Sequence, residues 1–124
     1  MSKIKRLPDS ELELMQIIWK MEAPVSRLDI EKMMPESHPL AATTILTLLT
    51  RLGEKGFLKV EKQGKTNLYT PLVTEKEYLA DESRNILNRL YGGSLKAFAM
   101  SLVDSGVSKD EIDELRKMLE ENKL

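Results

Sequence analysis

The chain has 124 residues, 41% of them hydrophobic, which is enough for one ordinary domain or for a small domain with an appendage. It contains no cysteine, which excludes disulfides, thiolate metal sites and a cysteine nucleophile, and its apolar runs are too short to span a membrane. The net charge of −1 is typical of a soluble protein and does not exclude nucleic-acid binding, because that binding depends on the field of one face.

The amino-terminal residues begin with two helical patterns. Apolar residues at helical spacing predict a first helix over about residues 10–21, with Trp19 filling the core between this helix and the third. Val25 is predicted to add a short strand residue. Ser26 then caps a second helix, with Asp29 completing an arrangement like a capping box.

A third helix is predicted over about residues 40–55, where apolar residues recur at i, i+3, i+4 and i+7. Gly56 fits the left-handed position that follows a helix end. The segments FLKVEK and LYTPLV lie on either side of a turn at Gly64, and they predict a β-hairpin with a basic tip.

Three further helices are predicted in the rest of the chain. Each starts at a polar cap, and the caps are Thr74 with Glu77, Ser94, and Ser108 with Glu111. The first of these helices ends at Gly92 and Gly93. We therefore predict two blocks, residues 1–73 with three helices and a hairpin, and residues 74–124 with three helices.

The carboxy-terminal helices carry apolar faces that a block of their size cannot bury by itself. Two arrangements would cover these faces: packing against a second copy of the chain, or folding back onto the amino-terminal block. We expect a homodimer. The predicted dimerisation residues are Leu79, Ile86, Leu90, Leu95, Phe98, Leu102, Ile112, Leu115 and Leu119.

The outer face of the third predicted helix is rich in threonine, which is a mediocre helix former. On a helical wheel, Thr43, Thr47 and Thr50 lie opposite the apolar stripe, and Thr44 and Arg51 lie on one flank. Thr44, Thr47 and Arg51 therefore form a continuous outward ridge, with Thr43 beside it. Such short side chains let a helix backbone approach the major groove of DNA, where hydroxyl and methyl groups find partners on base edges. Surface threonines are also tolerated as ordinary polar residues, but their density here favours DNA contact.

The predicted hairpin tip is basic. Lys62, Lys65 and Asn67 surround Gly64, with Tyr69 on the returning strand. A wing of this kind places cations and amides along a phosphate backbone, although such a tip is also an ordinary solubilising turn. The candidate DNA-contacting residues are Ser26, Ala42, Thr43, Thr44, Thr47, Arg51, Lys62, Lys65, Asn67 and Tyr69.

Several segments are informative in combination: ELELMQIIW, TTILTLLTRLGEKGFL, LYTP, YGGSLKAFAMSLVDSG and EIDELRKMLEE. Together they resemble the penicillinase-repressor family of bacterial transcription regulators, over nearly the whole chain. The resemblance implies a mainly α fold with a small β-hairpin wing, in which residues 1–73 form a winged helix-turn-helix DNA-binding domain. It implies that residues 74–124 form a three-helix dimerisation domain.

The resemblance also implies a function. It implies a cytoplasmic bacterial repressor that binds a palindromic double-stranded DNA operator as a homodimer. Thr43, Thr44 and Thr47 fall at the family's base-contacting positions, and Arg51 falls at a backbone contact. Thr43 stands where relatives often have a long basic residue and Leu46 where some have a polar one, so the operator sequence is expected to differ from theirs.

Two modes of induction are known in the family, and this sequence differs from the residues that each of them requires. Antibiotic-sensing members are cleaved at an Asn-Phe bond, and the corresponding pair here is Ser101 and Leu102. Because this pair differs, the resemblance does not carry over cleavage at this bond or β-lactam sensing, and a membrane sensor protease is kept only as a candidate partner. The copper-responsive members carry a Cys-rich tail, and the lack of cysteine excludes metal-thiolate induction here.

No cofactor, metal site or catalytic centre is predicted, and we do not expect an enzyme. His38 is the sole histidine and is interpreted as a solvated loop residue. Glu11 and Glu13 lie in the first turn of a helix, so they are interpreted as capping and solubilising groups. The alternative to DNA binding is a winged-helix module that binds another protein through the threonine ridge.

Overall fold

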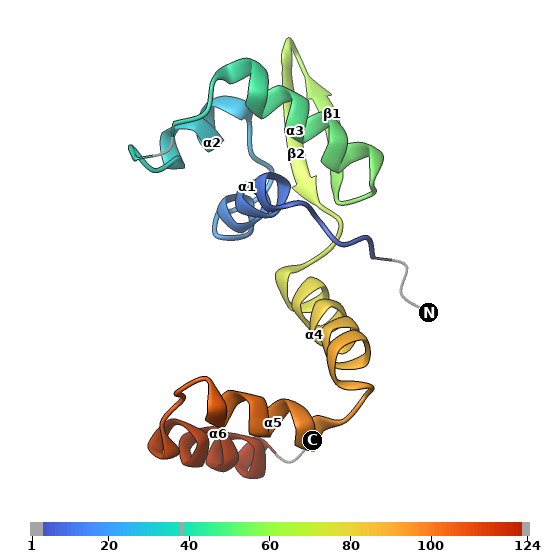
Figure 1. The fold of residues 1–124 in the computed structure, drawn as a ribbon. Coiled ribbons are helices and arrows are strands. Elements are labelled where there is room, and N and C mark those ends of the chain that lie inside the picture. Colours follow the sequence, from blue (N-terminus) through green and yellow to red (C-terminus); the bar gives the residue numbers. More distant parts are fainter. Residues whose placement is uncertain (1–3, 38, 123–124) are drawn as a thin grey trace. The chain divides into compact units, whose positions relative to one another are not determined.

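The computed structural model describes residues 4–37 and 39–122, which divide into two compact units with the boundary after Glu82. Within these residues the chain forms six helices and one two-stranded antiparallel sheet (Figure 1). The predicted mainly α fold with a small hairpin is confirmed, as is the predicted order of the elements along the chain. The boundary between the units lies further along the chain than the predicted boundary after residue 73.

The first unit contains three helices and the hairpin. Their bounds are α1 (Asp9–Trp19), α2 (Arg27–Met33), α3 (Ala42–Glu54), β1 (Leu58–Gln63) and β2 (Thr66–Pro71). In the hairpin, Val60 pairs with Tyr69 and Lys62 pairs with Asn67. Gly64 closes the turn with a φ of 64°, a conformation that favours glycine.

A capping box begins α2, as predicted. Ser26 Oγ accepts a hydrogen bond from the backbone N–H of Asp29 at 3.2 Å, and the Asp29 carboxylate accepts one from the backbone N–H of Ser26 at 2.9 Å. The bond from the Ser26 backbone is the main reason that the pKa of the Asp29 carboxyl lies below its usual value. Val25 forms a bridge with Tyr69, which confirms the predicted strand residue and ties the start of α2 to the hairpin.

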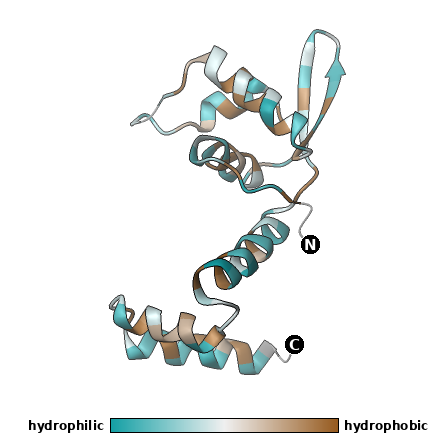
Figure 2. Cartoon of the chain, turned by 45° about the vertical axis from the view of Figure 1, so that its right-hand side comes forward, coloured by the Kyte–Doolittle hydropathy of each residue, from teal (hydrophilic) through white to brown (hydrophobic). Residues whose placement is uncertain are grey.

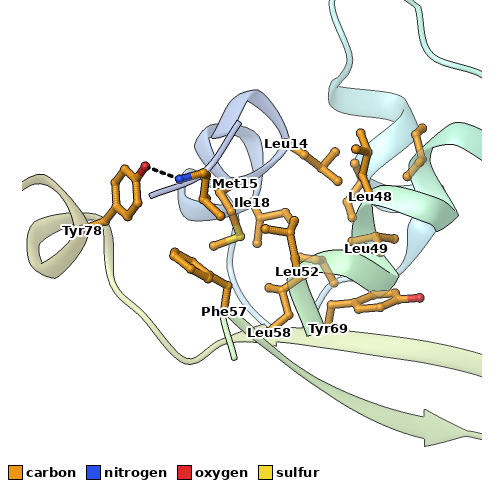
Figure 3. Close-up of a cluster of buried hydrophobic side chains, with 14 residues drawn as sticks. Leu14, Met15, Ile18, Leu48, Leu49, Leu52, Phe57, Leu58, Tyr69 and Tyr78 are labelled. Carbon is orange, nitrogen blue, oxygen red and sulfur yellow. Dashed lines mark hydrogen bonds between the residues drawn. The ribbon is translucent and has the colours of Figure 1, made fainter. Parts of the chain in front are cut away.

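The core of the first unit lies between α1, α3 and the base of the hairpin (Figure 3). The apolar stripe predicted for α3 is buried along its length, and its four residues are Ile45, Leu48, Leu49 and Leu52. Leu14, Met15 and Ile18 of α1 are buried as well. Phe57 and Leu58 close the core from the side of the sheet. Because α3 is held by its inner face, its outer face is left to solvent.

Trp19 is only partly buried and packs against the edge of the core, so the prediction that it fills the core is wrong. Its half-buried ring has its centroid 5.7 Å from the ring of Tyr78 in α4 (Glu75–Tyr91), and its Nε1 donates to the carbonyl of Val73 at 2.9 Å. Tyr78 also packs edge-on against Phe57, with ring centroids 5.7 Å apart. The first turns of α4 therefore belong to the core of the first unit, which is why the boundary lies inside this helix.

The second unit contains the end of α4, α5 (Leu95–Asp104) and α6 (Lys109–Asn122). The caps predicted for the last three helices are confirmed by their hydrogen bonds, which join Thr74 with Glu77, Ser94 with Ala97, and Ser108 with Glu111. Gly92 and Gly93 both have positive φ angles and end α4, as predicted.

In the second unit, α5 and α6 lie side by side and run in opposite directions (Figure 1). The ring of Tyr91 packs edge-on against Phe98 at 5.4 Å, and its hydroxyl donates to Ser101 Oγ at 3.0 Å. None of the described residues of this unit is buried. Figure 2 shows hydrophobic residues along both helices, so this unit by itself leaves apolar surface uncovered.

Candidate nucleic-acid interface

The threonine ridge of α3, which consists of Thr44, Thr47 and Arg51 with Thr43 beside it, is exposed along its whole length. Thr50 is also exposed on this face. The helical wheel therefore placed these residues correctly, because α3 is regular and its opposite face is buried. A surface built from short side chains and one guanidinium offers close approach, hydrogen bonding and a positive charge.

Two of these threonines use their hydroxyl protons inside the helix. Thr47 Oγ donates to the carbonyl of Thr43 at 3.0 Å, and Thr50 Oγ donates to the carbonyl of Leu46 at 2.9 Å. Bonds of this kind to the carbonyl four residues earlier are common for threonine within helices. These two side chains therefore present a methyl group and acceptor lone pairs to a partner. The helical wheel could not predict these hydrogen bonds, because it gives the direction of each side chain from the helix axis but not its rotamer.

An ion pair fixes the carboxyl end of α3 to α1. Lys55 Nζ lies 2.5 Å from Glu11 Oε1, and Glu11 is only 3% exposed. The interpretation of Glu11 as a capping and solubilising group is therefore wrong, because folding brings α1 against the end of α3 and buries this carboxylate. A buried carboxylate without a partner costs several kcal/mol, roughly 3–5, so the pair holds the two helices in register.

The wing presents its polar residues to solvent. Lys62, Lys65 and Asn67 are all exposed around the Gly64 turn. Lys62 and Asn67 are directly paired across the two strands, so a cation and an amide lie side by side near the tip. This arrangement can contact phosphates without reading sequence.

Three other candidate residues are less accessible. The side chain of Tyr69 is 4% exposed, and its backbone exchanges two hydrogen bonds with Val25 at 2.8 and 3.0 Å. Its ring lies with the core residues of α3 in Figure 3, because Tyr69 faces inward from β2. Tyr69 therefore helps to hold the wing in place, and its contact with DNA stays a prediction. Ser26 and Ala42 are half-buried, and Ser26 is occupied in the capping box.

A groove of about 210 Å³ lies between α2, α3 and the tip of the wing. It is lined by Ser26, Arg27, Leu28, Leu46, Lys65, Thr66, Asn67 and Tyr69. Sequence reasoning missed Arg27 and Leu28 as part of this surface. No periodic signal marks them, because only the packing of α2 against α3 and the bridge to the wing bring them here.

The family model described as penicillinase repressor matches residues 7–121. The chain belongs to the penicillinase repressor family. This confirms the predicted family and, because the family is one of repressors, the expectation that the protein is not an enzyme. Two relatives are similar along almost their whole length. The penicillinase repressor of Bacillus licheniformis is 36% identical over 99% of this chain and 96% of its own, and the methicillin resistance regulatory protein MecI of Mammaliicoccus sciuri is 34% identical over 95% and 96%.

A solved structure of a family member resembles the chain as well. It is the solution structure of the Bacillus licheniformis BlaI monomeric form in complex with the blaP half-operator. The match has 36% sequence identity and a TM-score of 0.52, and it covers 63% of this chain and 94% of that one. Part of this chain therefore shares its fold with a family member whose structure was solved in complex with a half-operator.

The residues predicted for dimerisation differ in their exposure. Leu79, Leu90, Leu95, Leu115 and Leu119 are exposed by 47–68%. The half-buried ones are Ile86, Phe98, Leu102 and Ile112. Other exposed apolar side chains on α5 and α6, which are not in the predicted dimerisation set, are Met100, Val103 and Met118. Leu79 lies within the first unit, because α4 begins there.

The described residues contain neither a candidate metal site nor a helix that could span a membrane. Among the described residues, no three His, Asp or Glu side chains come together in a way that could hold a metal ion. In the same part of the chain, no helix is long and apolar enough to cross a membrane. His38 lies outside the described residues.

Proposed function

We propose that the protein is a sequence-specific DNA-binding transcriptional repressor that acts as a homodimer on a palindromic operator. One observation carries the proposal: α3 exposes a continuous ridge of threonines with Arg51, beside a wing that carries Lys62 and Lys65, in a chain of a repressor family. Such a repressor binds chromosomal DNA, so we also propose that it acts in the cytoplasm of a bacterium.

The shape of the ridge fits the floor of a major groove. Thr43, Thr44 and Thr47 are short, so the axis of α3 can lie close to the base edges. Arg51 lies at the carboxyl end of the ridge, where a guanidinium reaches a phosphate or a guanine edge. Lys65 at the wing tip supplies a further phosphate contact, which adds affinity and orientation rather than sequence information.

The exposed apolar faces of the second unit support the proposed homodimer. Leu95 on α5 and Leu119 on α6 are 68% and 55% exposed, and no part of their own unit buries them. Leaving such side chains in water is unfavourable, by roughly 25 cal/mol for each Å² of apolar area that a partner would cover. A second copy of the chain offers the same face, and the twofold symmetry of that contact requires a palindromic operator.

A sensor protease stays a candidate partner. The bond between Ser101 and Leu102, which corresponds to the cleaved bond of some relatives, lies inside α5 with both residues half-buried. The hydroxyl of Tyr91 donates to Ser101, which further ties this turn of the helix to α4. Cleavage here requires local unwinding of α5, so induction by proteolysis would couple to the stability of this unit.

The proposed function is tested by selection of binding sites from random duplex DNA with the full-length chain, followed by fluorescence anisotropy titration of the selected duplex. We expect a palindromic consensus and an affinity that falls steeply as salt rises from about 50 to 200 mM, because phosphate contacts release counterions. A scrambled duplex of the same composition is the control. Binding without any sequence preference, or no binding, would instead favour a module that recognises protein through the same ridge.

A further inference from the structure

Leu46 is an exposed leucine on the helix that we propose to enter the major groove. It is 42% exposed and lies on the flank of α3 that faces the wing, where it lines the groove together with Lys65 and Asn67. A single exposed leucine is ordinary on a protein surface. Leu46, however, shares this groove with Leu28 of α2, which is 57% exposed. Two exposed leucines therefore line the same groove, on the side of α3 that faces the wing.

The surroundings of Leu46 combine apolar and cationic character. Arg27, Lys65 and Asn67 also line the groove and suit a sugar–phosphate backbone that passes between α3 and the wing. A phosphate has no favourable contact with a leucine side chain. The apolar group that a duplex presents in its major groove is the 5-methyl group of thymine. The groove is therefore complementary to a backbone at its polar residues and to a thymine methyl at Leu46.

The threonines next to Leu46 favour the same kind of partner. The hydroxyl protons of Thr47 and Thr50 are bonded to backbone carbonyls of α3, so their methyl groups and lone pairs remain for a ligand. The strip formed by Leu46, Thr47 and Thr50 thus has few protons to donate to base acceptors. Apolar contact is the readout that this strip can make most readily.

We propose that Leu46 is a specificity-determining residue, and that its side chain contacts the 5-methyl group of a thymine in each half of the operator. This inference rests on the proposed function, and it adds the chemical group that is read. It also assigns a role to Leu46 that the threonine ridge alone does not supply.

The test replaces each thymine of the selected operator, one position at a time and in both half-sites, by deoxyuridine, which lacks only the 5-methyl group. With the full-length chain, we expect one thymine position at which the change weakens binding by about fourfold per half-site, as the loss of one buried methyl group predicts. With Leu46→Ala, the same change should weaken binding by less than about twofold, because the partner of the methyl group is gone. Far-UV circular dichroism checks that this exposed substitution leaves the helices intact.

Met33→Ala is the matched control, because Met33 is 55% exposed on α2 but does not line the groove. It should leave the ratio of thymine to uracil affinities unchanged. A palindromic operator that is bound equally well with uracil at every position would overturn this inference while leaving the proposed function intact. An effect of uracil that persists undiminished in Leu46→Ala would overturn it as well. Failure to select any operator would count against the proposed function itself.

Discussion

The phenolic oxygen of Tyr78 accepts a hydrogen bond from the backbone N–H of Leu7 at 2.9 Å, although the two residues are 71 positions apart. Tyr78 is 2% exposed, and its ring packs against Trp19 and Phe57. One side chain of α4 thus joins the amino-terminal segment, the end of α1 and the start of the hairpin. The helix that leads into the second unit is thereby anchored in the first.

Removing the Tyr78 hydroxyl should destabilise the first unit. Tyr78→Phe keeps the ring contacts but leaves the buried N–H of Leu7 without an acceptor, which costs about 1–3 kcal/mol of unfolding free energy. Trp19, the single tryptophan, lies against this ring, so urea unfolding followed by tryptophan fluorescence reports the change. Tyr91→Phe removes a tyrosine hydroxyl bond in the second unit and should leave this transition in place. An equal midpoint for Tyr78→Phe and the parent chain would contradict the role of this bond.

The stability of the first unit should also fall in alkaline solution. Burial raises the pKa of the Tyr78 phenol above 10.0, against a smaller lowering by the hydrogen bond from Leu7. The unfolded chain therefore loses this proton at lower pH than the folded chain. The stabilisation that the protonated, buried phenol of Tyr78 contributes is fully present below about pH 10 and is lost as the pH rises through the folded-state pKa. Urea midpoints measured from about pH 8 to pH 11 should fall more steeply for the parent chain than for Tyr78→Phe, and parallel curves would refute the assignment.

Truncation of the threonine ridge should weaken operator binding. Thr47→Ala removes a methyl group and an acceptor from the middle of the ridge, which costs about 1–2 kcal/mol of binding free energy. Thr47→Val restores the methyl group and should recover part of the loss. Anisotropy titration of the selected duplex measures both variants, with Gln16→Ala, an exposed residue of α1, as the control. If Thr47→Ala bound as tightly as the control, the ridge would not be the reading surface.

The wing should contribute affinity without sequence preference. Lys65→Ala is expected to weaken binding to the operator and to a scrambled duplex by the same factor, and to reduce the slope of log affinity against log salt by about 0.9. Lys76→Ala removes an equal charge from an exposed site on α4 and serves as the control. A loss confined to the operator would mean that Lys65 reads a base rather than a phosphate.

A charge on the apolar face of α6 should separate the proposed homodimer. Leu119 is 55% exposed, so Leu119→Asp disturbs the packing of its own unit little, but it places a carboxylate in the proposed interface. Sedimentation equilibrium should give the mass of one chain for Leu119→Asp and the mass of two chains for Lys117→Asp, which places a carboxylate at an exposed polar site of the same helix. A dimeric mass for Leu119→Asp would place the interface elsewhere.

The elements of this protein follow from local signals in the sequence. The caps at Ser26, Thr74, Ser94 and Ser108 all form as predicted, because a capping bond joins residues only three positions apart. The threonine ridge could likewise be placed by periodicity, because a regular helix with one buried stripe must expose the opposite face. The sequence by itself therefore determined the order of the elements and the surface that we propose for DNA.

The tertiary structure decided what depends on contacts between distant residues. The hydrogen bonds of Trp19 to Val73 and of Leu7 to Tyr78 join residues 54 and 71 positions apart. Because they attach the start of α4 to the first unit, the boundary between the units lies inside α4. Sequence patterns indicated a solubilising group at Glu11 and a DNA-contacting residue at Tyr69, yet packing buries both side chains. The groove that gathers Leu28 and Leu46 also exists only because three elements meet there. The periodicity of a sequence indicates which face of a helix or strand is apolar. Only the packing of the chain decides which element covers that face and which rotamers the side chains of the opposite face adopt.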